Sequence, residues 1–417
     1  MSVLAGVLAP LVLGAGVHAW ARRWCPGVPW SVGVPLWGAL GCTVWLGLAT
    51  LGGVRWSGAL VLGMAVVGVV AASWAFRRGV PRPAGFWAVC AAVLAVPQGL
   101  RLLADPAFGW DFRYIWGLKA RVFAAAGGVD WPWLAWPGHE FAHPDYPPAW
   151  PGLLASAVVL GADVATVAAV WQGLLSLALA AVCWWAARGA PGPMRLVAAC
   201  AGAWAPVIFA PMHSGYAEPM LALAAAVAMA SLRDLAGREQ GSLVPLTAAV
   251  ALLACTKNEG IALAVGVVAG AAIVERRHGI VAAVGLLPAA AWGLGLRVHG
   301  IAGERLDLAP QLLARRAVGL PGALAGWVSS PELAALAAAC LLAVLGLRGR
   351  GARCVLVALG VWLAATAAMY VAGTRDLSWW FATSLERVLA APFPGVVALA
   401  IAGAGELARS ESEPEGA

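Results

Sequence analysis

The sequence predicts an all-α fold: a polytopic bundle of about 13 transmembrane helices. Of the 417 residues, 62% are hydrophobic and only 11% are charged, and the mean hydropathy is +0.83. A chain of this composition would expose too much apolar surface in water, whereas a bilayer solvates it. The formal net charge of +7 is typical of helices flanked by arginine in a membrane protein, so it does not indicate nucleic-acid binding.

Apolar runs long enough to cross a hydrocarbon core recur along the whole chain. The predicted spans lie near 2–20, 33–54, 57–76, 85–104, 163–187, 195–211, 217–232, 243–256, 260–274, 280–296, 333–347, 354–372 and 391–405. The first run has no basic segment before it, which favours a retained span over a cleaved signal peptide. Segment 147–161 is short and opens with Pro147 and Pro148, so we expect a re-entrant or interfacial helix there.

The arginines between these spans predict the orientation of the chain in the membrane. If 147–161 does not cross, the arginine groups fall on one side, which the positive-inside rule assigns to the cytoplasm of a multi-pass inner (plasma) membrane protein. The polar segments 109–151, 213–218, 257–259, 297–327 and 373–387 then share the opposite face. The predicted parts are a four-span segment (1–104), an outer catalytic loop with the re-entrant helix (105–162), a C-terminal bundle (163–405) and a cytoplasmic tail (406–417). The eight scattered cysteines show no CxxC spacing and are interpreted as small core residues.

The most polar stretch of the chain, 109–151, contains the first candidate site residues. Asp111 follows a predicted span in the sequence GWDF, among aromatic residues that would partly desolvate it. Such a carboxylate is suited to take a proton from an incoming hydroxyl, although a helix cap inside an interfacial aromatic belt is the alternative. Lys119 lies eight residues further on, and it and Lys257 are the two lysines in a chain whose other cationic side chains are arginines.

The same stretch contains the letters of a zinc-protease motif, HExxH, from His139 to His143. That motif needs a helix that places both histidines on one face. Here Pro137 and Gly138 precede it and Pro144 follows it, which disfavours a helix. We therefore expect the loop with His143, Asp145 and Tyr146 to form a rigid rim that contacts substrate or an adventitious metal.

Three later clusters are predicted on the same face. His213, Tyr216 and Glu218 begin a span, where the helix dipole stabilises a carboxylate that can hold a cation or a hydroxyl, or that merely starts the helix. Lys257, with Glu259 nearby, interrupts two apolar runs. At that depth its ammonium is expected to bind a lipid phosphate, or to pair with Glu259 or Glu218. Arg387 is a candidate second phosphate ligand.

The order of these motifs resembles that of bacterial GT-C type membrane glycosyltransferases. Trp110, Asp111, Lys119 and Ala120 are followed by HPDYPP, YAEP and TKNEG, then by Thr374, Asp376, Leu377, Trp379, Ser384 and Arg387. The chain is similar over about 100–395 to the protein O-mannosyltransferase and aminoarabinose transferase group. The resemblance implies a GT-C-like fold, a polyprenyl-phosphate sugar as donor, and an acidic base in the first large outer loop, which is Asp111 here.

The chemistry expected of these residues agrees with the resemblance. Sugar transfer from a lipid phosphate needs a cation for the leaving phosphate, a base for the acceptor and a groove for the isoprenoid tail. Lys257 or Arg387, Asp111 and the apolar helices supply these parts. A one-step inverting displacement needs one essential carboxylate, with Glu218 or Asp145 as alternates.

The expected partners are a polyprenyl-phosphate sugar, the lipid bilayer and an acceptor that is a glycan, a lipid or a protein. No nucleic acid is expected, and the sequence leaves open whether a divalent cation is needed. A lipid or solute transporter is the main alternative, an HExxH metalloprotease is a weaker one, and a non-catalytic assembly partner is a third.

Overall fold

The computed structural model describes residues 2–76, 109–208, 215–303, 308–328, 350–373 and 376–412. Within these ranges the chain is helical and forms no β-strand, which confirms the predicted all-α class. The predicted spans near 85–104 and 333–347 lie outside the described residues, as do His213, Thr374, Cys90 and Cys340.

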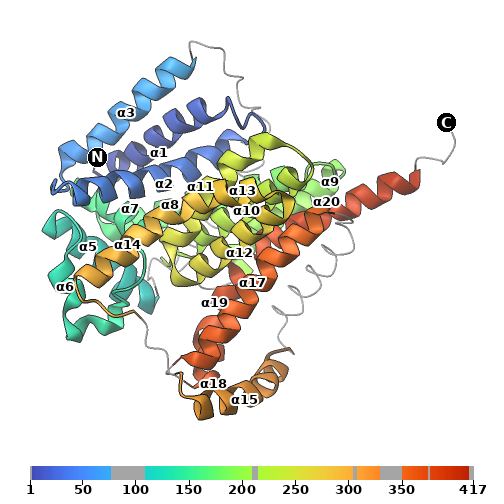
Figure 1. The fold of residues 1–417 in the computed structure, drawn as a ribbon. Coiled ribbons are helices and arrows are strands. Elements are labelled where there is room, and N and C mark those ends of the chain that lie inside the picture. Colours follow the sequence, from blue (N-terminus) through green and yellow to red (C-terminus); the bar gives the residue numbers. More distant parts are fainter. Residues whose placement is uncertain are drawn as a thin grey trace.

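Most predicted spans correspond to observed helices, which pack side by side in one bundle (Figure 1). They are α1 (Ser2–Ala21), α2 (Trp30–Leu51), α3 (Gly58–Phe76), α8 (Val164–Ala186), α9 (Gly192–Ile208), α10 (Glu218–Ala236), α11 (Leu243–Thr256), α12 (Asn258–Val274) and α17 (Arg350–Ala372). The predicted span near 280–296 is built from α13 (Arg276–Ala283), the 3₁₀ turn η5 (Val284–Leu286) and α14 (Leu287–Val298). The last span is α20 (Phe393–Ser412).

Six of the described helices are long and apolar enough to cross a membrane. A seventh candidate is the bent pair Leu377–Ala390 and Phe393–Glu406, whose halves meet at 47°. The helices Gly58–Trp74, Leu243–Thr256 and Asn258–Val274 are apolar but shorter. The structure thus supports a helical membrane protein, while the full count of about 13 spans stays a prediction.

The helix predicted at 147–161 forms as α7 (Ala149–Val158), and it is short, as expected. It is buried along nearly its whole length and packs against α1, α2, α5 (Gly117–Ala126) and α8. Gly6 of α1 lies directly against Ala157, where a β-carbon would collide with it. The helix is therefore part of the bundle interior, and its re-entrant or interfacial placement in the membrane stays a prediction.

Small residues allow the helices to approach closely. Gly16 of α1 faces the backbone of Gly68 in α3, and Gly266 of α12 faces the backbone of Ala358 in α17. Close packing through small residues is how helices associate in lipid, where the hydrophobic effect gives little drive. Five of the six described cysteines are buried and none of the six forms a disulfide, in agreement with their interpretation as small core residues.

The bundle has two chemically different ends. Helix α10 begins at Glu218 and carries Arg233 near its other end, about 22 Å away at 1.5 Å per residue. At the Arg233 end, Arg188 pairs with Asp234 and Arg233 pairs with Glu406; we call this the arginine end. The opposite end, where Lys257 joins α11 to α12, is the lysine end. The separation fits the predicted orientation, although which end faces the cytoplasm stays a prediction.

Candidate functional site

Asp111 lies in the first turn of a helix at the lysine end. This helix starts at Trp110, passes through a π-helical turn, η1 (Phe112–Trp116), and continues as α5. The Asp111 side chain makes no capping hydrogen bond. It accepts instead a hydrogen bond from the Nη1 atom of Arg387, with which it forms an ion pair. The alternative of a simple helix cap is therefore not what the structure shows.

Arg387 reaches Asp111 from the other end of the sequence. It lies in α19 (Glu386–Ala390), directly after α18 (Leu377–Trp380) and a second π-helical turn, η6 (Phe381–Leu385). Both members of the ion pair thus adjoin a π turn, a feature that often marks functional sites. Arg387 also places its Nε atom 3.9 Å from Oε1 of Glu218.

Lys257 is the centre of the cluster because the chain between α11 and α12 is extended at this residue (φ −160°, ψ 158°). Its side chain is 1% exposed. The ammonium lies 3.0 Å from Oε1 of Glu218 and 3.3 Å from Oε1 of Glu259. Both structural pairings that the sequence left open are therefore present. Asp111, Glu218, Lys257, Glu259 and Arg387 form one connected network, which we call the charged cluster.

The charged cluster contains three carboxylates and two cations. Several of its buried polar atoms have no hydrogen-bond partner among the described residues: the Oε2 atoms of Glu218 and Glu259, and the Nε atom of Arg387. The Nε1 atom of the neighbouring Trp116 shares this property. Buried groups of this kind are costly unless something satisfies them. These unpartnered groups include both hydrogen-bond donors and acceptors.

A stack of rings closes one side of the cluster. The Tyr146 ring is stacked on Trp116 at 5.4 Å and on His143 at 4.5 Å between centroids. The amines of Lys119 and Lys257 lie 5.8 and 5.9 Å from the Tyr146 ring, within the range of a cation–π interaction. Both lysine amines therefore lie near the Tyr146 ring.

The loop that carries Tyr146 is fixed from both sides. His143 adopts a left-handed backbone (φ 48°), which is uncommon outside glycine, and its carbonyl accepts a hydrogen bond from Lys119. The carboxylate of Asp145 accepts a hydrogen bond from Nδ2 of Asn258 at 2.7 Å, and its backbone carbonyl accepts one from Nε1 of Trp292 at 2.9 Å. The predicted rigid rim is therefore tied to α5, α12 and α14.

Burial changes the acidity of two groups in this rim. It lowers the pKa of Lys119 to about 7, and the charge of Asp145 opposes the shift only in part. Burial likewise lowers the pKa of His143, again against the charge of Asp145. Both shifts have the same cause, because burial disfavours the charged form of a base.

Tyr216 connects Asp111 to the start of α10. Its hydroxyl accepts a hydrogen bond from the backbone N–H of Asp111 at 3.3 Å, and the Arg387 guanidinium lies 5.6 Å from its ring centroid. Burial, followed by the charge of Asp111, raises the pKa of the Tyr216 phenol. Gly109 leaves the room that this hydroxyl occupies, since a β-carbon there would lie 2.5 Å from it.

The HExxH letters do not form the helix that a zinc protease requires. Residues Pro137–Ala142 form a 3₁₀ turn, η2, and His143 follows in the left-handed conformation. The Nδ1 atom of His139 lies 2.8 Å from the Trp133 carbonyl, and its ring stacks on that tryptophan. Within the described parts of the chain, no three His, Cys, Asp or Glu side chains are grouped to hold a metal ion.

The structure brings all ten predicted site residues to the lysine end, linked through successive contacts. They are Asp111, Lys119, His143, Asp145, Tyr146, Tyr216, Glu218, Lys257, Glu259 and Arg387. Sequence reasoning missed the contributions of Trp116, Asn258 and Trp292. Asn258 stands between two predicted site residues, which was the available signal, whereas nothing in the local sequence of Trp292 pointed to the site.

Comparisons of the chain with protein-family models, with curated proteins and with solved structures give no significant match. The class is therefore defined by the geometry itself: a helical membrane protein with a dry cluster of charges at one end of its bundle.

Proposed function

We propose that the chain is an integral membrane glycosyltransferase. It moves a sugar from a polyprenyl-phosphate donor to an acceptor hydroxyl or amine at the lysine end. The observation that carries the proposal is the set of buried donors and acceptors, in and beside the charged cluster, that have no hydrogen-bond partner among the described residues. Arg387 Nε and Trp116 Nε1 have N–H groups to give, and Glu218 and Glu259 have carboxylate oxygens to accept. A phosphate ester accepts hydrogen bonds, while sugar hydroxyls donate them, so a sugar phosphate matches both sets.

The electrostatics of the cluster support an anionic leaving group. Helices α10 and α12 begin at Glu218 and Asn258, so two helix N-termini, which carry partial positive charge, converge near Lys257. Arg387 and Lys257 add two full positive charges. A phosphate that leaves with the developing negative charge is stabilised by such preorganised groups in a water-poor site.

Asp111 is the proposed base, and its pairing with Arg387 suggests when it acts. In the free protein the Asp111 carboxylate is held in the ion pair with Arg387. A donor phosphate competes for the same guanidinium, so donor binding draws Arg387 away and leaves Asp111 free to contact the acceptor. The acceptor proton then passes to Asp111 while the acceptor atom bonds to the anomeric carbon. The bond from that carbon to the phosphate oxygen breaks, and polyprenyl phosphate leaves.

The proposal is tested with radiolabelled polyprenyl-phosphate sugar and membrane extracts that supply the acceptor. Wild-type protein should transfer label, whereas Asp111→Asn should lower the rate by roughly 100-fold or more, since it removes the base but keeps the size of the side chain. Glu275→Gln is the matched control, because Glu275 is a half-exposed carboxylate at the arginine end. The contrary result is that the wild-type protein moves the polyprenyl-phosphate sugar into the opposite leaflet without transferring sugar from any such donor. That result would refute the glycosyltransferase proposal in favour of the transporter alternative.

A further inference from the structure

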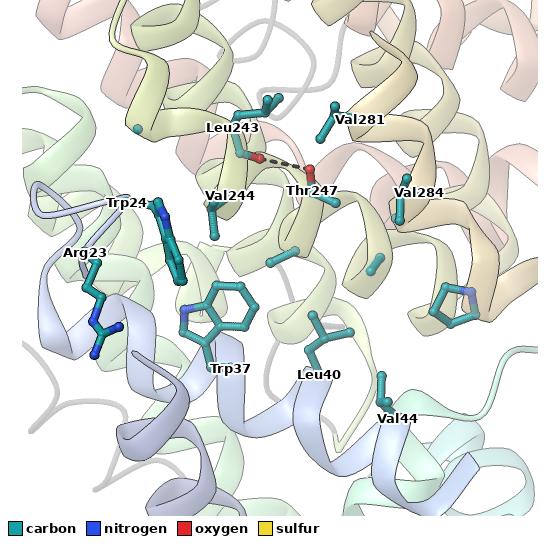
Figure 2. A pocket seen from close by; sticks show the side chains of 15 residues that line it. Arg23, Trp24, Trp37, Leu40, Val44, Leu243, Val244, Thr247, Val281 and Val284 are labelled. Carbon is teal, nitrogen blue, oxygen red and sulfur yellow. Dashed lines mark hydrogen bonds between the residues drawn. The ribbon is translucent and has the colours of Figure 1, made fainter. Parts of the chain in front are cut away.

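A cavity lies away from the charged cluster. It is a groove of about 730 Å³ between α2, α11 and the segment that runs from α13 into α14 (Figure 2). Its volume is within the range of about 300 to 1,000 Å³ that ligand sites occupy. No residue of the charged cluster lines it.

The walls of the groove are almost entirely apolar. Trp37, Leu40 and Val44 line it from α2, and Val244 faces them from α11 (Figure 2). The Thr247 hydroxyl is already bonded to the Leu243 carbonyl at 2.9 Å, so it offers the groove no free donor. A flexible hydrocarbon chain is the kind of ligand that such a surface accommodates.

One end of the groove is different, because Arg23 and Trp24 form it. The guanidinium of Arg23 lies 3.8 Å from the ring centroid of Trp74, and no carboxylate pairs with it in the described part of the chain. Stacking on an aromatic face leaves the N–H edge of a guanidinium free to bind a phosphate. Trp24 is 44% exposed and fits the level of lipid headgroups.

The charge sits at the arginine end of the bundle. Gly241, which precedes α11, packs directly on the Trp24 carbonyl, and Lys257 lies at the far end of α11. A lipid whose phosphate bound at Lys257 would direct its tail, and not its headgroup, toward Arg23. Arg23, the one cation among the described residues that line the groove, therefore selects a lipid of the leaflet at the arginine end.

We propose that this groove binds one anionic phospholipid, with its phosphate at Arg23 and an acyl chain along Trp37, Leu40 and Val44. The site is independent of the glycosyl transfer proposed above. It gives the protein a specific lipid contact that ties α2 to α11, two helices that also support the lysine end.

The test is native mass spectrometry of the full chain in mild detergent, with added phosphatidylglycerol or phosphatidylcholine of the same acyl chains. Wild-type protein should retain one phosphatidylglycerol in preference to phosphatidylcholine. Arg23→Glu should weaken phosphatidylglycerol retention by roughly tenfold or more, because it reverses a charge next to the phosphate. Arg276→Glu is the matched control: Arg276 is an exposed arginine near the same end that does not line the groove, and it should retain the lipid.

Two further variants separate the parts of the site. Val284→Trp fills the groove from an exposed position and should reduce retention of the lipid although Arg23 is intact. Trp74→Leu removes the stacked ring but keeps the charge, and should retain the lipid. If Arg23→Glu and Arg276→Glu lose phosphatidylglycerol equally, the lipid is held by diffuse electrostatic attraction to the protein surface, and the proposed site is wrong. Loss of the lipid in Lys257→Met but not in Arg23→Glu would assign the groove to a lipid held from the lysine end and would also overturn it.

Discussion

The charge balance of the cluster predicts that its two ion-pair partners respond unequally to mutation. Removing one partner of a buried pair usually costs about 3 to 5 kcal/mol, because the other charge is left uncompensated. The cluster has three carboxylates and two cations. Asp111→Asn leaves two of each, with Glu218 still 3.9 Å from Arg387, and the amide can still accept a hydrogen bond. We therefore expect a cost of about 1 to 2 kcal/mol.

Arg387→Gln has the opposite effect on the same pair. It leaves three buried carboxylates with Lys257 alone, so the full cost of about 3 to 5 kcal/mol is expected. The measurement is unfolding of both variants by SDS titration from a mild detergent, with Glu275→Gln as control. The transfer rate of Asp111→Asn is measured in parallel and should fall by about 100-fold or more.

Two results would refute this reasoning. If Asp111→Asn is as destabilised as Arg387→Gln, the count of buried charges does not control the stability of the cluster. If Asp111→Asn keeps near-normal transfer while Glu218→Gln is inactive, the base is Glu218 and the assignment of Asp111 is wrong.

Four further predictions concern the two lysines, the HExxH letters and the orientation. Lys257→Arg should keep part of the transfer activity if the phosphate needs only charge, whereas a pocket shaped for an amine should lose it, because guanidinium is planar and larger; steady-state kinetics distinguish the two. The pKa of Lys119 is about 7 in the folded protein and near 10.5 when unfolded, so the unfolded chain binds more protons between these values and stability should rise with pH from 7 to 10. Melting curves of Lys119→Met should lack this rise, and an unchanged slope would contradict the shift. His139→Ala should retain transfer within a few fold, and a loss of bound zinc together with a loss of proteolysis in that variant would restore the protease hypothesis. Impermeant thiol reagents should label Glu140→Cys from outside intact cells and should not label Arg276→Cys, and the reverse pattern would invert the topology.

The helices could be predicted well from the sequence because lipid solvation leaves a strong local signal. Runs of apolar residues bounded by charged residues or glycine predicted α8 and α11 to within about one residue at each end. Hydropathy could not tell whether an apolar run crosses the membrane or ends inside the bundle. α12 is shorter than a full span because Lys257 interrupts the run before it. Neighbouring helices surround the polar backbone groups at its ends, which lipid could not satisfy.

The candidate site was predictable in membership but not in connectivity. Charged residues are costly among apolar helices, so Lys257, Glu218 and Asp111 stood out as residues with a function or a partner. Which carboxylate pairs with which cation depends on how helices pack, and the pair between Asp111 and Arg387 spans 276 positions of the chain. The role of Trp292 depends on the path of α14 past the rim loop, which no local pattern reports.

The two π turns beside Asp111 and Arg387 have a mechanical consequence. Each holds one residue more than an α-helical turn, and such an insertion can migrate along a helix without melting it. Each step of the migration turns the residues on one side of it by about 100°, the angle per residue of an α-helix. A migration at Phe112–Trp116 or at Phe381–Leu385 would swing Asp111 or Arg387 out of register with its partner. Such a migration would break the ion pair between Asp111 and Arg387 while both helices stay folded.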